Sequence, residues 1–237
     1  MLIMLGGGSP AAGAESGRLS EADKLLQSPN LDLAQARQAL DIYESALPTA
    51  GSERLPLLIK LARGYFILGD LADKGPRRGY YEKGRNYAEQ LLREQPDRVE
   101  SHYWLALNLA GLANTGGKTE GYKLLPRIME GLQRSLLLDP AYDQAGGHRV
   151  LGRIYYEAPG WPLSVGNLEK SLQHLRQATA LAPDNSTNHL YLAETLTRLD
   201  QEAEAKRELE KVLKSNRHAV WPQGVEDDRQ QARHLLK

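Results

Sequence analysis

The chain has 237 residues, and its 30 lysine and arginine side chains balance 30 aspartate and glutamate side chains, so the formal net charge is zero. A neutral total disfavours a nucleic-acid binder, because neutralising phosphates requires an excess of basic residues. Since the sequence contains no cysteine, disulfides, thiolate nucleophiles and cysteine-based metal sites are excluded. With 41% hydrophobic and 25% charged residues, the composition is that of a globular protein rather than a disordered chain.

The N-terminal stretch from Met1 to Ala14 carries no charge. Its apolar start, followed by Ala12-Gly13-Ala14, resembles the end of a secretory signal peptide with an A-x-A cleavage site, although the basic n-region is missing. We therefore expect residues 1–18 to be a flexible tail or the remnant of a clipped signal peptide, and the protein to be exported to a bacterial periplasm rather than cytoplasmic. No later stretch approaches the 18 or more apolar residues of a membrane span, so no transmembrane segment is expected.

Three prolines divide the rest of the chain at spacings of 44 and 43 residues, each beside an aspartate and each after an apolar-periodic run: Pro96, Pro140 and Pro183. Because proline cannot continue a helix, each is predicted to follow a helix end. Each is followed by a second helix that begins with a histidine, has leucine three residues later and then a small residue. No alternating β-branched run of useful length is present, so we expect an all-α fold.

This pattern of residues resembles the tetratricopeptide repeat, whose signature is W-x2-L-G-x2-Y, then A-x3-F, then P. Gly84, Ala88, Leu91 and Pro96 occupy the positions of a second repeat helix. The resemblance implies an α-solenoid of antiparallel helix pairs, in which small residues let two helices approach closely and large residues fill the gaps. We predict about four and a half pairs between residues 19 and 216, within a single domain over residues 19–237.

The predicted repeats are longer than the standard 34 residues, and the excess falls between the two helices of a pair. The expected insertions in these turns are Leu71–Tyr81, Ala113–Leu125 and Ala158–Asn167. Trp161 in the third insertion either covers a helix end or contacts a ligand or partner. After a turn at residues 221–224, a polar helix over residues 225–236 is expected to cap the stack.

The stretch from Leu61 to Leu213 also resembles two families with this repeat, the T component of periplasmic TRAP transporters and the regulator of microtubule dynamics proteins. The resemblance rests on Leu138-Asp139-Pro140, the helix from His148 to Tyr156, the Leu181–Asp184 turn, and the helix that starts at Asn188. It implies an all-α scaffold without catalytic residues and, for the transporter relative, an exported location.

Two patterns resemble chemical sites, and both are better explained as structure. Residues 114–119 resemble the end of a phosphate-binding loop, but Leu112 stands where the motif needs glycine, so we expect a flexible turn between helices. The three repeat histidines, His102, His148 and His189, should lie one repeat apart along the stack, too far for a shared metal ion. No acid–base or nucleophile constellation emerges, so the protein is not expected to be an enzyme or to bind a cofactor or metal.

The repeat register places the first helix of each pair along a concave groove. The residues predicted to face it are Ile59, Arg63, Phe66, Tyr103, Leu107, Arg149, Arg153, Tyr156, Leu190, Glu194 and Arg198. From these, with Trp161, we select as the candidate binding set Arg63, Phe66, Tyr103, Arg149, Arg153, Tyr156, Trp161 and Arg198. Four arginines among aromatic rings form a surface able to bind carboxylates. The alternative is internal pairing, for instance of Arg153 with Glu157 or Glu194.

These observations lead to two hypotheses of function. The first is a non-enzymatic scaffold that binds a protein partner, such as an acidic segment, through the concave groove. The second is a periplasmic accessory protein of a transport system, which binds a small carboxylate or apolar ligand in a pocket formed with the inserted loops.

Overall fold

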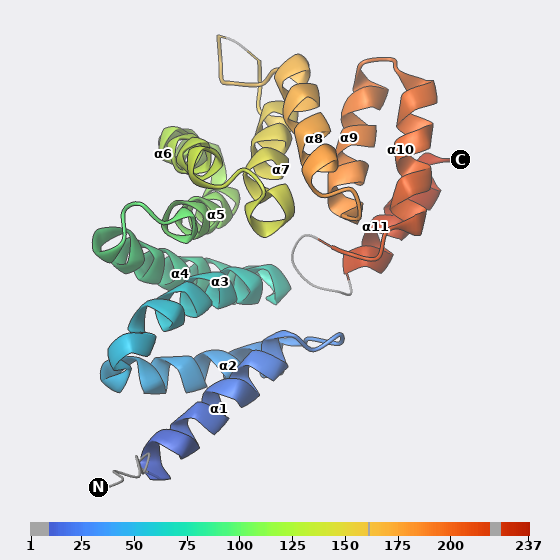
Figure 1. Cartoon of the computed structure of the whole chain (residues 1–237). Coiled ribbons are helices and arrows are strands. Elements are labelled where there is room, and N and C mark those ends of the chain that lie inside the picture. Colours follow the sequence, from blue (N-terminus) through green and yellow to red (C-terminus); the bar gives the residue numbers. More distant parts are fainter. Residues whose placement is uncertain (1–9, 161, 219–223) are drawn as a thin grey trace, which may run out of the picture.

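The computed structural model describes residues 10–160, 162–218 and 224–237 (Figure 1). These residues form eleven α-helices and two short 3-10 turns, with no β-strand beyond two isolated bridges. The helices are α1 (Pro10–Leu26), α2 (Leu33–Ala46), α3 (Arg54–Leu71), α4 (Lys74–Glu94), α5 (Val99–Thr115), α6 (Gly117–Leu138), α7 (Tyr142–Glu157), α8 (Leu168–Leu181), α9 (Ser186–Arg198), α10 (Glu202–Lys214) and α11 (Gly224–Leu235). The expected all-α fold is confirmed.

Successive helices pack as hairpins into a curved stack that runs from α1 and α2 at one end to α10 and α11 at the other (Figure 1). Helix α1 packs on α2 and forms a complete hairpin with it at the N-terminal end of the stack, where the prediction of four and a half pairs allowed for a single unpaired helix. Because α1 begins at Pro10, part of the expected tail is helical, while residues 1–9 lie outside the described residues. At the other end, α11 packs on α9 and α10, as predicted for a capping helix.

The helix ends follow the three prolines as predicted. Helices α4, α6 and α8 end at Glu94, Leu138 and Leu181, each two residues before its proline. Two of the helices that follow a break begin with a capping asparagine, whose side-chain oxygen accepts a hydrogen bond from the backbone N–H three residues on: Asn167 before α8 and Asn185 before α9. Such caps satisfy backbone donors that the first helical turn leaves unpaired.

The prediction that Leu71–Tyr81 and Ala113–Leu125 form long turns between helices is wrong. Only two residues separate α3 from α4, and Gly116 alone separates α5 from α6. The extra residues instead lengthen α4 and α6 to 21 and 22 residues. Helix α4 can contain Pro76 because this residue lies in the first turn. Backbone N–H groups of the first turn have no acceptor within the helix, so the N–H that proline lacks is not needed there. The third insertion is confirmed as a loop between α7 and α8, and Trp161 lies outside the described residues.

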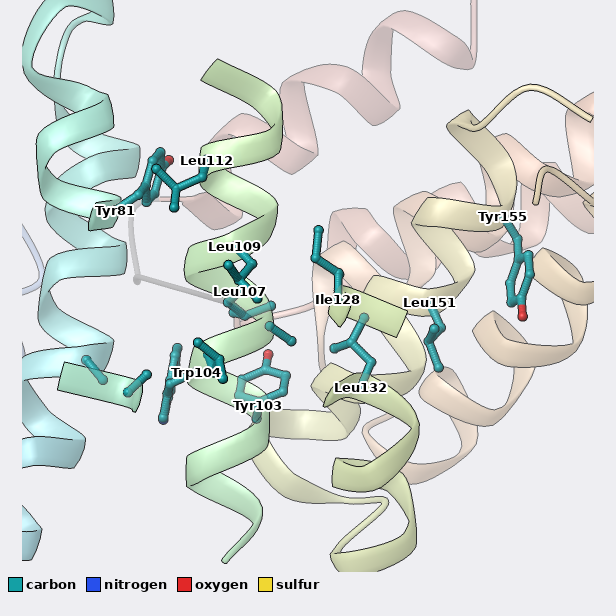
Figure 2. Packing of buried hydrophobic residues seen from close by; sticks show 14 residues of the cluster. Tyr81, Tyr103, Trp104, Leu107, Leu109, Leu112, Ile128, Leu132, Leu151 and Tyr155 are labelled. Carbon is teal, nitrogen blue, oxygen red and sulfur yellow. The ribbon is translucent and has the colours of Figure 1, made fainter. Parts of the chain in front are cut away.

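The largest part of the core lies where α5 packs against its neighbours on both sides (Figure 2). Tyr81 of α4 occupies space left by two glycines, since a Cβ at either Gly69 or Gly111 would overlap its ring. At the other end of α5, Tyr103 and Trp104 are buried and meet edge to face, with ring centroids 5.0 Å apart. This packing fixes the side of α5 that faces the concave surface of the stack.

Candidate partner-binding cavity

The concave surface contains a cavity of about 360 Å³ that is lined by residues of α3, α5, α7 and α9, together with Tyr81 of α4 and His218. We call it the concave cavity. Its charged lining consists of Arg63 and Asp70 on α3 and of Asp143, Arg149 and Arg153 on α7. Its aromatic lining consists of Phe66, Tyr81, Tyr103, Trp104 and Tyr191. The repeat register therefore identified this side of the stack correctly, although the two aspartates were not predicted.

Arg149 forms part of the wall of the concave cavity and is buried, at 4% exposure. One of its nitrogens, Nη2, donates to Asp143 Oδ2 at 3.1 Å and to the Tyr103 hydroxyl at 3.2 Å. The Tyr103 hydroxyl in turn donates to the same Asp143 carboxylate at 2.6 Å. Burial of the ring, together with the charge of Asp143, raises the pKa of Tyr103. Arg149 is therefore neutralised inside the protein rather than open to a partner.

The backbone beside Arg149 turns through three consecutive left-handed residues, Asp143, Gln144 and Ala145, with φ of 49°, 57° and 62°. A left-handed non-glycine residue costs about 1–2 kcal/mol. The turn is held by its surroundings: Arg149 Nη1 donates to the carbonyls of Asp143 and Gln144, each at 3.2 Å. Asn188 Nδ2 donates to the Gln144 carbonyl at 3.2 Å. We define this segment with its bound arginine as the left-handed turn.

Arg153 is also paired within the protein. Its Nε lies 2.6 Å from Glu157 Oε1, and its Nη1 forms an ion pair with Glu194. The guanidinium also lies over the rings of Tyr156 and Tyr191, at 5.0 Å and 4.5 Å from their centroids. The alternative of internal pairing, left open by the sequence, is what the structure shows for this residue.

Arg198 and Tyr156 lie outside the lining of the concave cavity, next to Arg153. Arg198 stacks on the same Tyr156 ring as Arg153, with its guanidinium carbon 4.6 Å from the ring centroid. It also donates to the Tyr156 carbonyl at 2.9 Å. Arg198 is exposed and joins none of the ion pairs among the described residues.

Arg63 differs from Arg149 and Arg153 because no carboxylate within the described residues neutralises it. Its guanidinium carbon lies 6.0 Å from the ring centroid of Trp104, and the side chain is half-buried. The ring of Phe66, one turn further along α3, packs against the same indole, with the two ring centroids 6.2 Å apart. The four arginines thus fall into two classes: Arg149 and Arg153 are paired, and Arg63 and Arg198 are open to an external anion.

Asp70 gives the concave cavity an acidic end. Its Oδ1 accepts a hydrogen bond of 2.6 Å from the Tyr81 hydroxyl. Burial raises the pKa of Asp70, while the hydrogen bond from Tyr81 and the charge of Arg77 act in the opposite direction. Its position could have been read from the sequence, because Asp70 follows Arg63 by seven residues and therefore shares its helix face.

The three repeat histidines have separate partners. His102 and His189 place Nε2 at 2.6 Å and 2.8 Å from the carbonyl oxygens of Pro96 and Pro183. His148 faces His174 of α8 instead, with the two Nδ1 atoms 3.0 Å apart. In the parts of the chain that the structure describes, no group of three histidine, aspartate or glutamate side chains is placed to hold a metal ion.

Among the same described residues, no helix is long and apolar enough to cross a bilayer.

Comparisons with known proteins agree with this architecture. The model of the family described as regulator of microtubule dynamics protein 1-3 matches residues 18–164, which is more than half of the chain, and a tetratricopeptide-repeat model matches residues 163–221. The regulator of microtubule dynamics protein 3 of Rattus norvegicus is 25% identical over 205 residues, or 80% of this chain. The match spans 42% of the rat protein, so this chain corresponds to less than half of that relative.

Two solved structures share the fold at low sequence identity. The thermophilic tetratricopeptide protein TTC0263 of Thermus thermophilus superposes with a TM-score of 0.68 at 20% identity, over 94% of this chain and 98% of that one. The MamA protein superposes with a TM-score of 0.52 at 15% identity, over 86% of this chain and 92% of that one. Both show the α-solenoid fold and nothing more specific. The resemblance to the TRAP transporter component stays a prediction.

Proposed function

Because the chain belongs to the regulator of microtubule dynamics protein 1-3 family, we propose that it is a non-enzymatic scaffold that binds an acidic segment of a protein partner along its concave surface. The tetratricopeptide fold is in general that of a protein-interaction scaffold. The proposal adds to this general role a surface and a partner chemistry.

The proposal rests on the finding that two of the four arginines predicted for the concave surface are paired with carboxylates and two are not. Arg63 and Arg198 have no carboxylate partner among the described residues, and both stack on an aromatic ring. Arginine binds carboxylates through a planar fork of donors, and stacking on a ring orients that fork. An acidic segment along the concave surface would therefore meet an open arginine at each end, with the paired Arg149 and Arg153 between them.

Charge reversal at the open arginines tests this proposal. We expect Arg63→Glu and Arg198→Glu each to lower the amount of partner captured from a lysate of the native host, and the double variant to abolish capture. Arg207→Glu makes the same charge change at an exposed position on α10 and serves as the control. Undiminished capture by a folded double variant would refute the proposed surface.

A small-molecule carrier is the second candidate, and the size of the concave cavity favours it. Pockets for small ligands typically enclose about 300–1,000 Å³, and this cavity encloses about 360 Å³. No described residue of the loop at 158–167 lines it, so the pocket expected from the inserted loops would be formed by helices instead. Mass spectrometry of small molecules that co-purify with the protein tests this role, and fractionation of the native host tests the proposed export to the periplasm.

A further inference from the structure

The concave cavity is electrically polarised along α3. Arg63 and Asp70 both line it and lie seven residues apart on that helix. At a rise of 1.5 Å per residue, this spacing separates them by about 10 Å along the helix axis and places them on one face. Asn114 of α5 lines the same cavity and adds a further polar group to its lining. The cavity therefore has a cationic position and an anionic position along one wall.

Asp70 retains a free acceptor. Tyr81 donates to Oδ1, whereas Arg77 donates to the backbone carbonyls of Asp70 and Ala72 rather than to the carboxylate. No described residue donates to Asp70 Oδ2, and this atom is not among the fully buried polar atoms without a partner. Asp70 is partly buried, and a partly buried carboxylate with an unused oxygen is stabilised by a donor that reaches it.

Between Arg63 and Asp70, the side of the cavity formed by α3 is apolar. Phe66 lies between Arg63 and Asp70 on α3, and Leu107 of α5 lines the same cavity. Trp104 packs against Phe66 and also supports Arg63. An occupant that matches this wall has an apolar middle and opposite charges at its ends.

We propose that the concave cavity selects a peptide segment with an acidic and a basic residue about 10 Å apart, the acid on Arg63 and the base on Asp70. The proposal rests on the proposed function and adds the order of charges to it. Three residues of extended or polyproline II chain span about 10 Å, and in polyproline II residues i and i+3 share a face. The spacing Glu-x-x-Lys with apolar or proline residues between is therefore the expected pattern.

The probe is a fluorescein-labelled Gly/Ser peptide containing Glu-Leu-Pro-Lys, with fluorescence anisotropy as the readout. Two matched peptides replace Lys with Gln or place Glu and Lys side by side. We expect the first peptide to bind about tenfold more tightly than either of the others, the scale of one charge-assisted hydrogen bond. Equal binding of all three peptides overturns the proposal.

A charge-swap cycle tests the two positions directly. Arg63→Glu and Asp70→Lys should each weaken binding of the Glu-Leu-Pro-Lys peptide about tenfold or more, and the double swap should restore it, because the peptide can bind in the reverse direction. Glu130→Lys, at an exposed position on α6, makes the same charge change as Asp70→Lys and should leave binding unchanged. If Asp70→Lys proves unfolded by circular dichroism, Asp70→Asn replaces it and should remove the preference for Lys over Gln.

The outcomes separate this proposal from the scaffold function. One outcome is that Arg63→Glu weakens binding of the Glu-Leu-Pro-Lys peptide, while the Asp70 variants bind it as tightly as the wild-type protein and the Gln peptide binds as tightly as the Lys peptide. The order of charges is then refuted, and the acidic-segment scaffold stands. If the wild-type protein binds none of the peptides, the charge-order proposal is refuted, and the capture assay with Arg63 and Arg198 variants decides the scaffold function by itself.

Discussion

The guanidinium of Arg149 and the carboxylate of Asp143 are joined on the concave surface by an ion pair of 3.1 Å, and the same guanidinium donates to the Asp143 main-chain carbonyl at 3.2 Å. One side chain therefore both neutralises the aspartate and holds its backbone in the left-handed region. The residue that the repeat register placed in the binding groove is thus committed to supporting the wall of the concave cavity.

Replacement of Arg149 should therefore destabilise the protein rather than merely weaken a ligand site. Arg149→Ala leaves the partly buried Asp143 carboxylate without its cation, and breaking a buried pair typically costs about 3–5 kcal/mol. Arg63→Ala, which breaks no ion pair, should cost less than about 1 kcal/mol. Urea unfolding of the two variants measures both values. Equal stabilities would contradict a structural role for Arg149.

The strain in the left-handed turn makes a second prediction. Ala145→Gly removes a strain of about 1–2 kcal/mol at φ 62° and loses a buried methyl group worth about 0.8 kcal/mol. We expect the free energy of unfolding to stay unchanged or to rise by up to about 1 kcal/mol. Ala106→Gly in the regular part of α5 should lower it by about 1–2 kcal/mol. If both variants lose stability equally in urea, the turn is not strained.

Two glycines of α4 should respond oppositely to the same substitution. A Cβ at Gly84 would overlap the side-chain amide of the buried Asn108, which donates to the carbonyls of Ala62 and Trp104. Gly84→Ala should therefore cost about 1–3 kcal/mol through overpacking. A Cβ at Gly79 meets nothing within 4 Å, so Gly79→Ala should gain up to about 1 kcal/mol in helix propensity. Thermal melting of the pair checks both signs, and a stabilising Gly84→Ala would disprove the close approach.

The contact between His148 and His174 predicts a loss of stability in mild acid. Burial of the ring lowers the pKa of His174 to about 4, with a further contribution from the charges of His148 and Lys170. The unfolded chain, with a histidine pKa of about 6.5, binds more protons between about pH 6.5 and pH 4, so the free energy of unfolding falls as the pH falls through this window. Burial and the charge of Arg149 lower the pKa of His218 to about 4 as well, which adds to the same slope.

His174→Asn should make this pH dependence shallower, by up to about 1.4 kcal/mol per pH unit. Urea midpoints measured across the window provide the test. His234→Asn, at an exposed position on α11, is the matched control and should keep the wild-type slope. An unaltered slope in His174→Asn would show that the histidine contact carries no linkage to folding.

Much of the fold could be predicted because it depends on local rules. The positions of Pro96, Pro140 and Pro183 mark helix ends two residues earlier. The two insertions at residues 71–81 and 113–125 were predicted wrongly because the repeat consensus sets the length of a unit but not the length of its helices. Most of their residues extend α4 and α6.

The candidate site was predictable only in part. Helix periodicity identified the face that carries Arg63, Phe66, Tyr103, Arg149 and Arg153, and all five line the concave cavity. The sequence offered Glu157 and Glu194 as possible partners of Arg153, and both form ion pairs with it. Periodicity could not show that Arg149 is neutralised, because Asp143 reaches it across a left-handed turn. Asp70 was not among the predicted residues, because the predicted surface was cationic and an acid on the same helix face does not fit that pattern.

The concave cavity also has a mechanical consequence. Its lining comes mainly from α3, α5, α7 and α9, with Tyr81 of α4 and His218, whereas each repeat of a solenoid in general contacts only its neighbours. An occupant that touches Arg63 on α3 and Tyr191 on α9 would therefore add contacts between two helices that are not neighbours along the chain. Filling the cavity would stiffen the part of the solenoid between α3 and α9 and favour one curvature of that part, so that a force that changes the curvature would also weaken binding of the occupant.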